Sequence, residues 1–160
     1  MAAPESFEQF VAARSAALLR TAYLLTGNHH DAEDLVQIAL VKAVPAWARI
    51  QDDPEPYVRR ILVRENISRW RRRRWREVHV PDVPDAGHGE DGTDRLALAR
   101  ALASLAPRQR AVIVLRYYED LTERETAELL GVSVGTVKSQ ARDALARLRQ
   151  LLPEAEFVPS

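Results

Sequence analysis

The 160-residue chain lacks cysteine, and this absence excludes disulfide bonds and thiolate metal sites. Its four histidines are not spaced as paired metal ligands beside acids on one helix face, so the sequence predicts no metal site. No apolar run approaches the roughly 20 residues needed to cross a bilayer. The N-terminal stretch MAAPESFEQF has neither the basic start nor the apolar core of a signal peptide. We therefore expect a cytoplasmic protein without a membrane partner.

Lysine is also scarce, with 2 lysines against 21 arginines, and the formal net charge is zero. This neutrality conceals a strong segregation of charge along the chain. Residues 57–76 carry nine arginines and one acid, whereas residues 77–94 carry six acids and no lysine or arginine. The stretch SRWRRRRWRE (68–77), drawn on a helical wheel, has arginines on every side, which argues against an amphipathic membrane anchor. Such a dense, unpaired cationic block favours a phosphate-bearing partner.

The apolar content of 46% is enough for a folded core, and its spacing is helical throughout. Residues 77–94 are acidic, rich in proline and without helical periodicity, which is typical of a linker. No stretch has the alternation of a strand. The sequence therefore predicts an all-α fold of two small helical domains, residues 5–76 and 95–152, joined by an acidic flexible linker over residues 77–94.

Three helices are expected in the first domain. One spans about residues 6–27 and ends at Gly27, and a second starts near residue 31 and is ended or kinked by Pro45. The third is expected to have Asp53 as its cap and Pro54 as its first residue. The second helix carries an apolar stripe with i, i+3, i+4, i+7 spacing: Ala32, Leu35, Val36, Ala39, Leu40 and Ala43.

The second domain contains a predicted helix-turn-helix. Thr122 and Glu125 form a capping box, Gly131 lies in the turn, and Ser133 is placed to cap the last helix. That helix has one apolar face, and its opposite face carries polar residues near its N-terminal half: Thr136, Lys138, Ser139 and Arg142. This is the arrangement in which a second helix enters the major groove of DNA. A helical hairpin that only packs is the weaker alternative.

The stretch GVSVGTVKSQARDALARLR, with the preceding ALASLAPRQRAVIVLRYYEDLTERETAELL, resembles the helix-turn-helix that reads the −35 promoter element in bacterial RNA polymerase sigma factors of the extracytoplasmic-function (ECF) group. DAEDLVQIALVKAVPAW resembles the segment of those proteins that docks on the polymerase β′ clamp helices. YVRRILVRENISRWRRRR resembles the helix that reads and opens the −10 element. The similarity covers nearly the whole chain in the right order. It implies a non-catalytic specificity subunit of RNA polymerase, with no cofactor.

The resemblance also implies roles for individual residues. Contacts with core polymerase fall on Asp31, Asp34, Leu35 and Gln37. Recognition and melting of the −10 element fall on Trp47, Asn66, Arg69, Arg72, Arg73 and Arg76, although burial in a small core is an equal alternative for the tryptophan. Recognition of the −35 element falls on Ser133, Thr136, Lys138, Ser139 and Arg142. The implied partners are core RNA polymerase (β′ clamp helices and β subunit) and promoter DNA. An anti-sigma factor is common in this group, although no residue here identifies one.

The sequence departs from the family at the recognition helix, where SQARDA replaces the more basic SRLHRA. Two other functions are alternatives to the sigma factor. A stand-alone helix-turn-helix regulator would bind duplex DNA without polymerase, and an RNA-binding protein would use the arginine block alone. Neither function needs the DAEDLVQ segment, so both are disfavoured.

Overall fold

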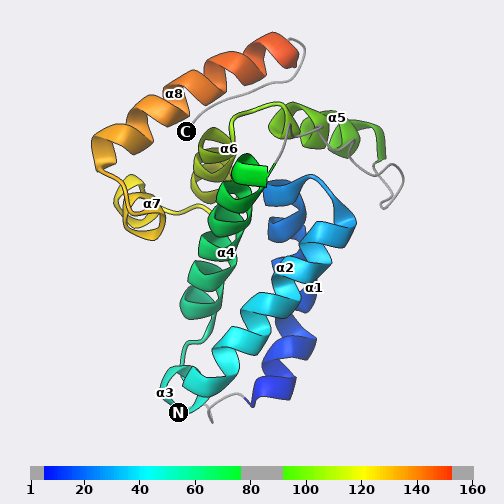
Figure 1. Ribbon diagram of the computed structural model, residues 1–160, viewed down its shortest axis with the longest axis vertical. Coiled ribbons are helices and arrows are strands. Elements are labelled where there is room, and N and C mark those ends of the chain that lie inside the picture. The colour runs from blue at the N-terminus through cyan, green and yellow to red at the C-terminus, as the bar shows by residue number, and fades with distance from the viewer. Residues whose placement is uncertain (1–5, 77–91, 153–160) are drawn as a thin grey trace.

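The computed structural model describes residues 6–76 and 92–152, and for residues 73–76 and 92–96 it describes only the backbone. Every regular element in these two ranges is helical (Figure 1), which confirms the all-α prediction. The N-terminal half contains α1 (Phe7–Thr26), α2 (His29–Ala43), the 3-10 turn η1 (Val44–Ala46), α3 (Trp47–Ile50) and α4 (Glu55–Arg76). The C-terminal half contains α5 (Gly92–Ala103), α6 (Pro107–Ile113), the π-helical turn η2 (Val114–Tyr118), α7 (Glu123–Leu130) and α8 (Val134–Leu151).

The helix ends follow the local sequence signals closely. Gly27 ends α1 in the left-handed conformation, with φ of 74°. Pro45 lies in η1, directly after the end of α2, so the predicted break is confirmed. The next helix begins one residue later than expected: the Pro54 carbonyl accepts from the Val58 amide at 3.0 Å, and Glu55 is the first helical residue. A proline at residue 56 is tolerated because amides of the first turn have no partner within the helix.

The apolar stripe of α2 forms the centre of the largest core. All six of its residues are buried: Ala32, Leu35, Val36, Ala39, Leu40 and Ala43. They pack between α1 and α4, and these three helices lie side by side in Figure 1. The core also receives Ala111, Val114 and Leu115 from the second half of the chain. The two halves therefore share one hydrophobic core.

The last three residues of the predicted linker segment belong to a helix. Helix α5 begins at Gly92, so residues 92–94 are helical, and residues 77–91 lie outside the described residues. The sequence of segment 77–94 did not indicate this helix start, because Gly-Thr-Asp at residues 92–94 is also a common loop sequence. A Thr-Asp pair after glycine is equally suited to the first turn of a helix.

The five residues from Ala111 to Leu115, at the end of α6 and the start of η2, are all buried. Val112 packs with Ala127 and Val137, whereas Ile113 packs with Leu102 and Leu148. The turn is widened because the Glu119 amide bonds to the Val114 carbonyl, five residues earlier, at 2.9 Å. A helical stretch that is apolar on every side has to be surrounded by protein. Residues 111–115 consequently connect the separate packing clusters.

Candidate nucleic-acid interface

The helix-turn-helix forms as predicted, through reciprocal hydrogen bonds at the helix ends. The Thr122 amide donates to Glu125 Oε1 at 2.9 Å, and the Glu125 amide donates to Thr122 Oγ1 at 3.0 Å. The bond from the Thr122 amide holds the pKa of Glu125 below its ordinary value, and the bond with the Thr122 side chain acts in the same direction. Gly131 turns the chain with φ of 69°, and Ser133 Oγ accepts from the Thr136 amide at 3.1 Å to start α8.

Helix α8 has one buried and one outward face. The buried face consists of Val137, Ala141, Ala144, Leu145 and Leu148. On the other side, Ser133, Lys138 and Arg142 are exposed, and Thr136 and Ser139 are half-buried. Arg142 Nε lies 3.6 Å from Asp143 Oδ1, and both side chains are largely exposed, so this contact holds the guanidinium only weakly. All five residues predicted for the −35 element therefore lie on the first half of α8 or at its cap.

The structure brings Arg69 of α4 against the acidic start of α2. Its Nη1 donates to the Asp31 carbonyl at 3.1 Å, and its Nη2 donates to Asp34 Oδ2 at 3.4 Å. The same Nη2 lies 3.9 Å from Asp31 Oδ1. Two residue sets that were predicted for different partners, polymerase and the −10 element, are thus in direct contact.

The remaining arginines predicted for the −10 element continue along α4. Arg72 is exposed and donates to Ser68 Oγ at 3.2 Å, and Asn66 is half-buried. The backbone of α4 is helical as far as Arg76, but the side chains of Arg73 and Arg76 lie outside the described residues.

Trp47 packs within the core of the N-terminal half. Its ring lies 5.3 Å from that of Phe7 at an interplanar angle of 89°, and 5.4 Å from that of Phe10. These are favourable aromatic geometries, and they leave the indole half-buried. The structure therefore shows the packing role of Trp47, while contact with DNA stays a prediction.

One predicted polymerase contact needs correction. Leu35 is 0% exposed, because it belongs to the apolar stripe that faces α1 and α4, so it cannot touch a partner while the core is intact. Asp34 and Gln37 are exposed, and Asp31 is half-buried.

Two exposed valines that the sequence did not single out follow Gln37, one on the outer face of α2 and one at the start of η1. Val41 is 66% exposed and Val44 is 52% exposed, at spacings of four and seven residues from Gln37. The signal was present in the sequence, since both valines fall outside the buried stripe of six residues. Single exposed valines are normal on a protein surface, and these two are of interest because they follow Gln37, a predicted polymerase contact.

Neither a metal site nor a membrane-spanning helix is found in the part of the chain that the structure describes. Within residues 6–76 and 92–152 no group of three histidine or acidic side chains is placed to hold a metal ion. None of the described helices has the length and apolar character required to span a bilayer.

In this all-helical fold, the capped second helix of the pair presents its polar face outward. This arrangement defines a helix-turn-helix protein of the kind that reads duplex DNA. The family model for Sigma-70 region 2 matches residues 10–76, and the model for Sigma-70, region 4 matches residues 95–148. The chain belongs to the RNA polymerase sigma factors, in the extracytoplasmic-function group. This confirms the resemblance found in the sequence.

Named relatives and solved structures agree with this assignment. The RNA polymerase sigma-E factor of Streptomyces avermitilis is 43% identical over 94% of this chain and 87% of its own length. The ECF RNA polymerase sigma factor SigL of Mycobacterium tuberculosis is 35% identical over 88% of this chain and 85% of its own. The sigma factor RpoE from Bartonella quintana, solved in complex with the anti-sigma factor NepR, superposes with a TM-score of 0.78 at 27% identity, covering 94% of this chain and 98% of that one.

Proposed function

We propose that this sigma factor binds core RNA polymerase and opens the −10 element through residues 5–76, and reads the −35 element through residues 95–152. The observation that carries the proposal is the division of α8 into a fully buried apolar face and an outward face bearing Lys138 and Arg142. A helix anchored on one side and polar on the other can enter the major groove without disturbing the core. The relatives named above support the polymerase as the partner.

The polymerase contact is proposed for the outer face of α2. Asp34 and Gln37 supply polar groups there, and Val41 adds an exposed apolar side chain on the same face. Leu35 lies on the buried side of α2 and stabilises this surface indirectly, because it packs α2 against α1 and α4. The partner surfaces are the β′ clamp helices for α2 and the β subunit for the C-terminal half.

The −10 contact is proposed for α4, where the arginines hold phosphates and Asn66 lies nearer the bases. Guanidinium groups along a helix supply sequence-independent affinity for the DNA backbone. Arg69 can contact DNA phosphates together with the other arginines only after its hydrogen bonds with Asp31 and Asp34 are broken. Binding of polymerase to those two acids and release of Arg69 toward DNA are therefore expected to favour each other.

The protein is proposed to be no enzyme and to need no cofactor, because the polymerase carries out the chemistry and the sigma factor selects the start site. It acts in the cytoplasm, where polymerase and promoter DNA are found. An anti-sigma factor is proposed as a further partner, on the similarity to the Bartonella quintana protein solved with NepR.

Run-off transcription with purified core polymerase on a promoter library tests the proposal. We expect co-purification with core and transcripts that start at a defined distance from a shared pair of sequence motifs. A protein that neither associates with core nor directs any promoter-specific start is not acting as a sigma factor. Tight, sequence-specific binding to duplex DNA by the isolated protein would instead support the stand-alone regulator.

A further inference from the structure

We propose that Asp143 is a specificity-determining residue of the −35 contact: its carboxylate accepts a hydrogen bond from the amino group of a cytosine, while the neighbouring Arg142 donates to the guanine of the same base pair. Asp143 is not among the residues that the sequence predicted for this contact. The inference rests on the proposed function, because it names the base pair that one part of α8 selects.

Asp143 lies on the outward face of α8, among the residues proposed to read DNA. It follows Ser139 by four residues and Thr136 by seven, and these spacings place side chains on one face of a helix. Its side chain is 60% exposed, and that of Arg142 is 77% exposed. Asp143 is one residue, or about 1.5 Å of helix rise, beyond Arg142. A groove that admits Arg142 therefore also receives Asp143.

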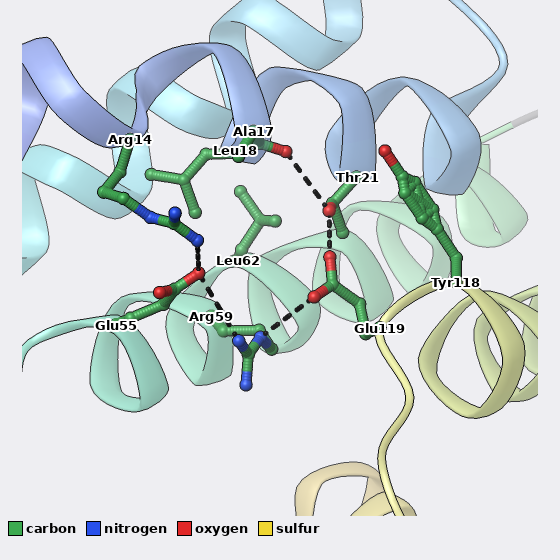
Figure 2. A pocket seen from close by; sticks show the side chains of 9 residues that line it. All are labelled: Arg14, Ala17, Leu18, Thr21, Glu55, Arg59, Leu62, Tyr118 and Glu119. Atoms are coloured by element: carbon green, nitrogen blue, oxygen red, sulfur yellow. Dashed lines mark hydrogen bonds and ion pairs between the residues drawn. The ribbon is translucent and has the colours of Figure 1, made fainter.

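The fold gives a structural reason for other acids in the C-terminal half. Glu119, after η2, accepts from the hydroxyl of Thr21 on α1, and its Oε2 lies 3.5 Å from Arg59 Nε on α4, as Figure 2 shows. Glu125 accepts from the Thr122 amide and so caps α7. These carboxylates are held by partners within the chain.

Asp143 differs from these acids. It lies in the middle of α8, so it neither caps the helix nor adds to the charges that favour a first turn. Aspartate is also one of the poorer helix formers at an interior position. Its ion pair with Arg142 joins two exposed side chains at 3.6 Å, and such pairs add little to stability. A carboxylate at this position therefore contributes little to the fold.

On a surface that reads DNA, a carboxylate is selective because it can only accept hydrogen bonds. Phosphate oxygens, guanine O6 and N7 and thymine O4 are acceptors too, so each of them repels it. The major groove offers two amino donors, N4 of cytosine and N6 of adenine. The adenine amino group stands beside the acceptor N7, which suits the paired donor and acceptor of an amide side chain. Cytosine is therefore the better partner for a carboxylate.

Arg142 supplies the complementary group. Its guanidinium only donates, and it matches O6 and N7 of guanine. Its Nε lies 3.6 Å from Oδ1 of Asp143, so a donor and an acceptor are presented side by side. Guanine O6 and cytosine N4 also lie side by side in the major groove, because they are hydrogen-bonded to each other within the base pair. The two side chains together therefore match one G·C pair.

The first experiment measures base preference at each −35 position. Holoenzyme assembled from core polymerase and this protein transcribes a promoter library randomised in the −35 element, and the transcribed promoters are sequenced. The unmodified protein should prefer a G·C pair, in one orientation, at one position. Asp143→Ala should reduce that preference by about 5- to 150-fold and leave the preferences at the other positions within about twofold.

The second experiment changes the chemistry of the side chain at nearly constant size. Asp143→Asn supplies an amide, which pairs with N6 and N7 of adenine, so the preferred base at that position should change from cytosine to adenine. Arg142→Ala should weaken the preference for the same base pair, because it removes the contact with the guanine. The Tm of Asp143→Asn should stay unchanged, because the side chain is exposed. A residue that only stabilised α8 would instead change Tm and no base preference.

Glu128→Gln is the matched control. Glu128 is an exposed acid on α7, and this substitution removes the same charge from the helix-turn-helix as Asp143→Asn does. Repulsion between an acid and the phosphates acts at every DNA sequence. The control should therefore leave every base preference unchanged.

The outcomes separate this assignment from the proposed function. The assignment is wrong if Asp143→Ala leaves every position unchanged, if the position it relaxes is not a G·C pair, or if Glu128→Gln relaxes the same position. If the unmodified protein directs no promoter-specific transcript, the proposed function fails. The same library, bound as duplex DNA by the isolated protein, then decides whether Asp143 selects cytosine.

Discussion

Replacing Leu35 by alanine separates a structural role of α2 from a binding role. Leu35 is 0% exposed and lies in the largest core cluster, so the substitution removes packed side-chain atoms and leaves a cavity. Buried leucine-to-alanine changes cost about 3 kcal/mol of unfolding free energy. For a chain of this size each kcal/mol corresponds to about 2–4 °C in Tm, so a fall of about 6–12 °C is expected.

Gln37→Ala is the matched substitution on the exposed side of the same helix. It should change the free energy of unfolding by no more than about 0.5 kcal/mol, because Gln37 is exposed. It should weaken binding to core polymerase by about two- to tenfold, which corresponds to the loss of one hydrogen bond.

Both variants are measured by thermal unfolding followed by circular dichroism and by titration of labelled protein with core polymerase well below Tm. Leu35→Ala should lower Tm while it binds polymerase within about threefold of the unmodified protein, a difference of less than about 1 kcal/mol. An unchanged Tm together with a large loss of affinity would show that Leu35 touches the polymerase, and the assignment of the buried face of α2 would then be wrong.

Three further predictions concern the proposed polymerase contact, the proposed −35 contact and the cap of α7. Val41→Asp should weaken binding to core polymerase at least about tenfold with little change in Tm, because it places a charge on an exposed apolar position at the proposed contact; the same titration measures it. Arg142→Ala should cost about 1–3 kcal/mol of discrimination between a selected −35 sequence and a scrambled one in run-off assays, while core binding is unchanged. The pKa of Glu125 is lowered in the folded state, so the stability contributed by its carboxylate is complete above the unfolded pKa of about 4.3 and is lost as pH falls through the lower folded pKa. Glu125→Gln keeps an acceptor for the Thr122 amide but should abolish this part of the pH dependence, as measured by urea unfolding between about pH 3 and pH 6.

Helix ends were predictable because their signals are local. The capping pair Thr122 and Glu125, the cap Ser133 and the left-handed Gly131 each act within three or four residues, and all are found as expected. Leu35 carried two conflicting signals: its place in the apolar stripe predicted burial, and family resemblance predicted a contact. The apolar stripe correctly predicted that Leu35 is buried, because burial of apolar area dominates the energetics of a small helical core.

The joining of the halves could not be predicted in this way. Thr21 and Glu119 are 98 positions apart, and neither residue is distinctive in its local sequence. Their meeting depends on how α6 and η2 enter the N-terminal core, which is a property of tertiary packing. The exposed valines of α2 and η1 are an intermediate case, since the helical wheel places them outside the stripe but gives no partner for them.

The complete burial of residues 111–115 has a consequence for the lifetime of the protein in a cell. The sequence AVIVL is uncharged, contains no proline and is rich in β-branched residues, which are the properties of segments that promote aggregation when exposed. Separation of the halves uncovers the side of this segment that bears Val114 and Leu115. A chain in which the halves separated would therefore present a surface for self-association and for proteases. The packing of Val114 and Leu115 into the N-terminal core therefore keeps an aggregation-prone segment covered.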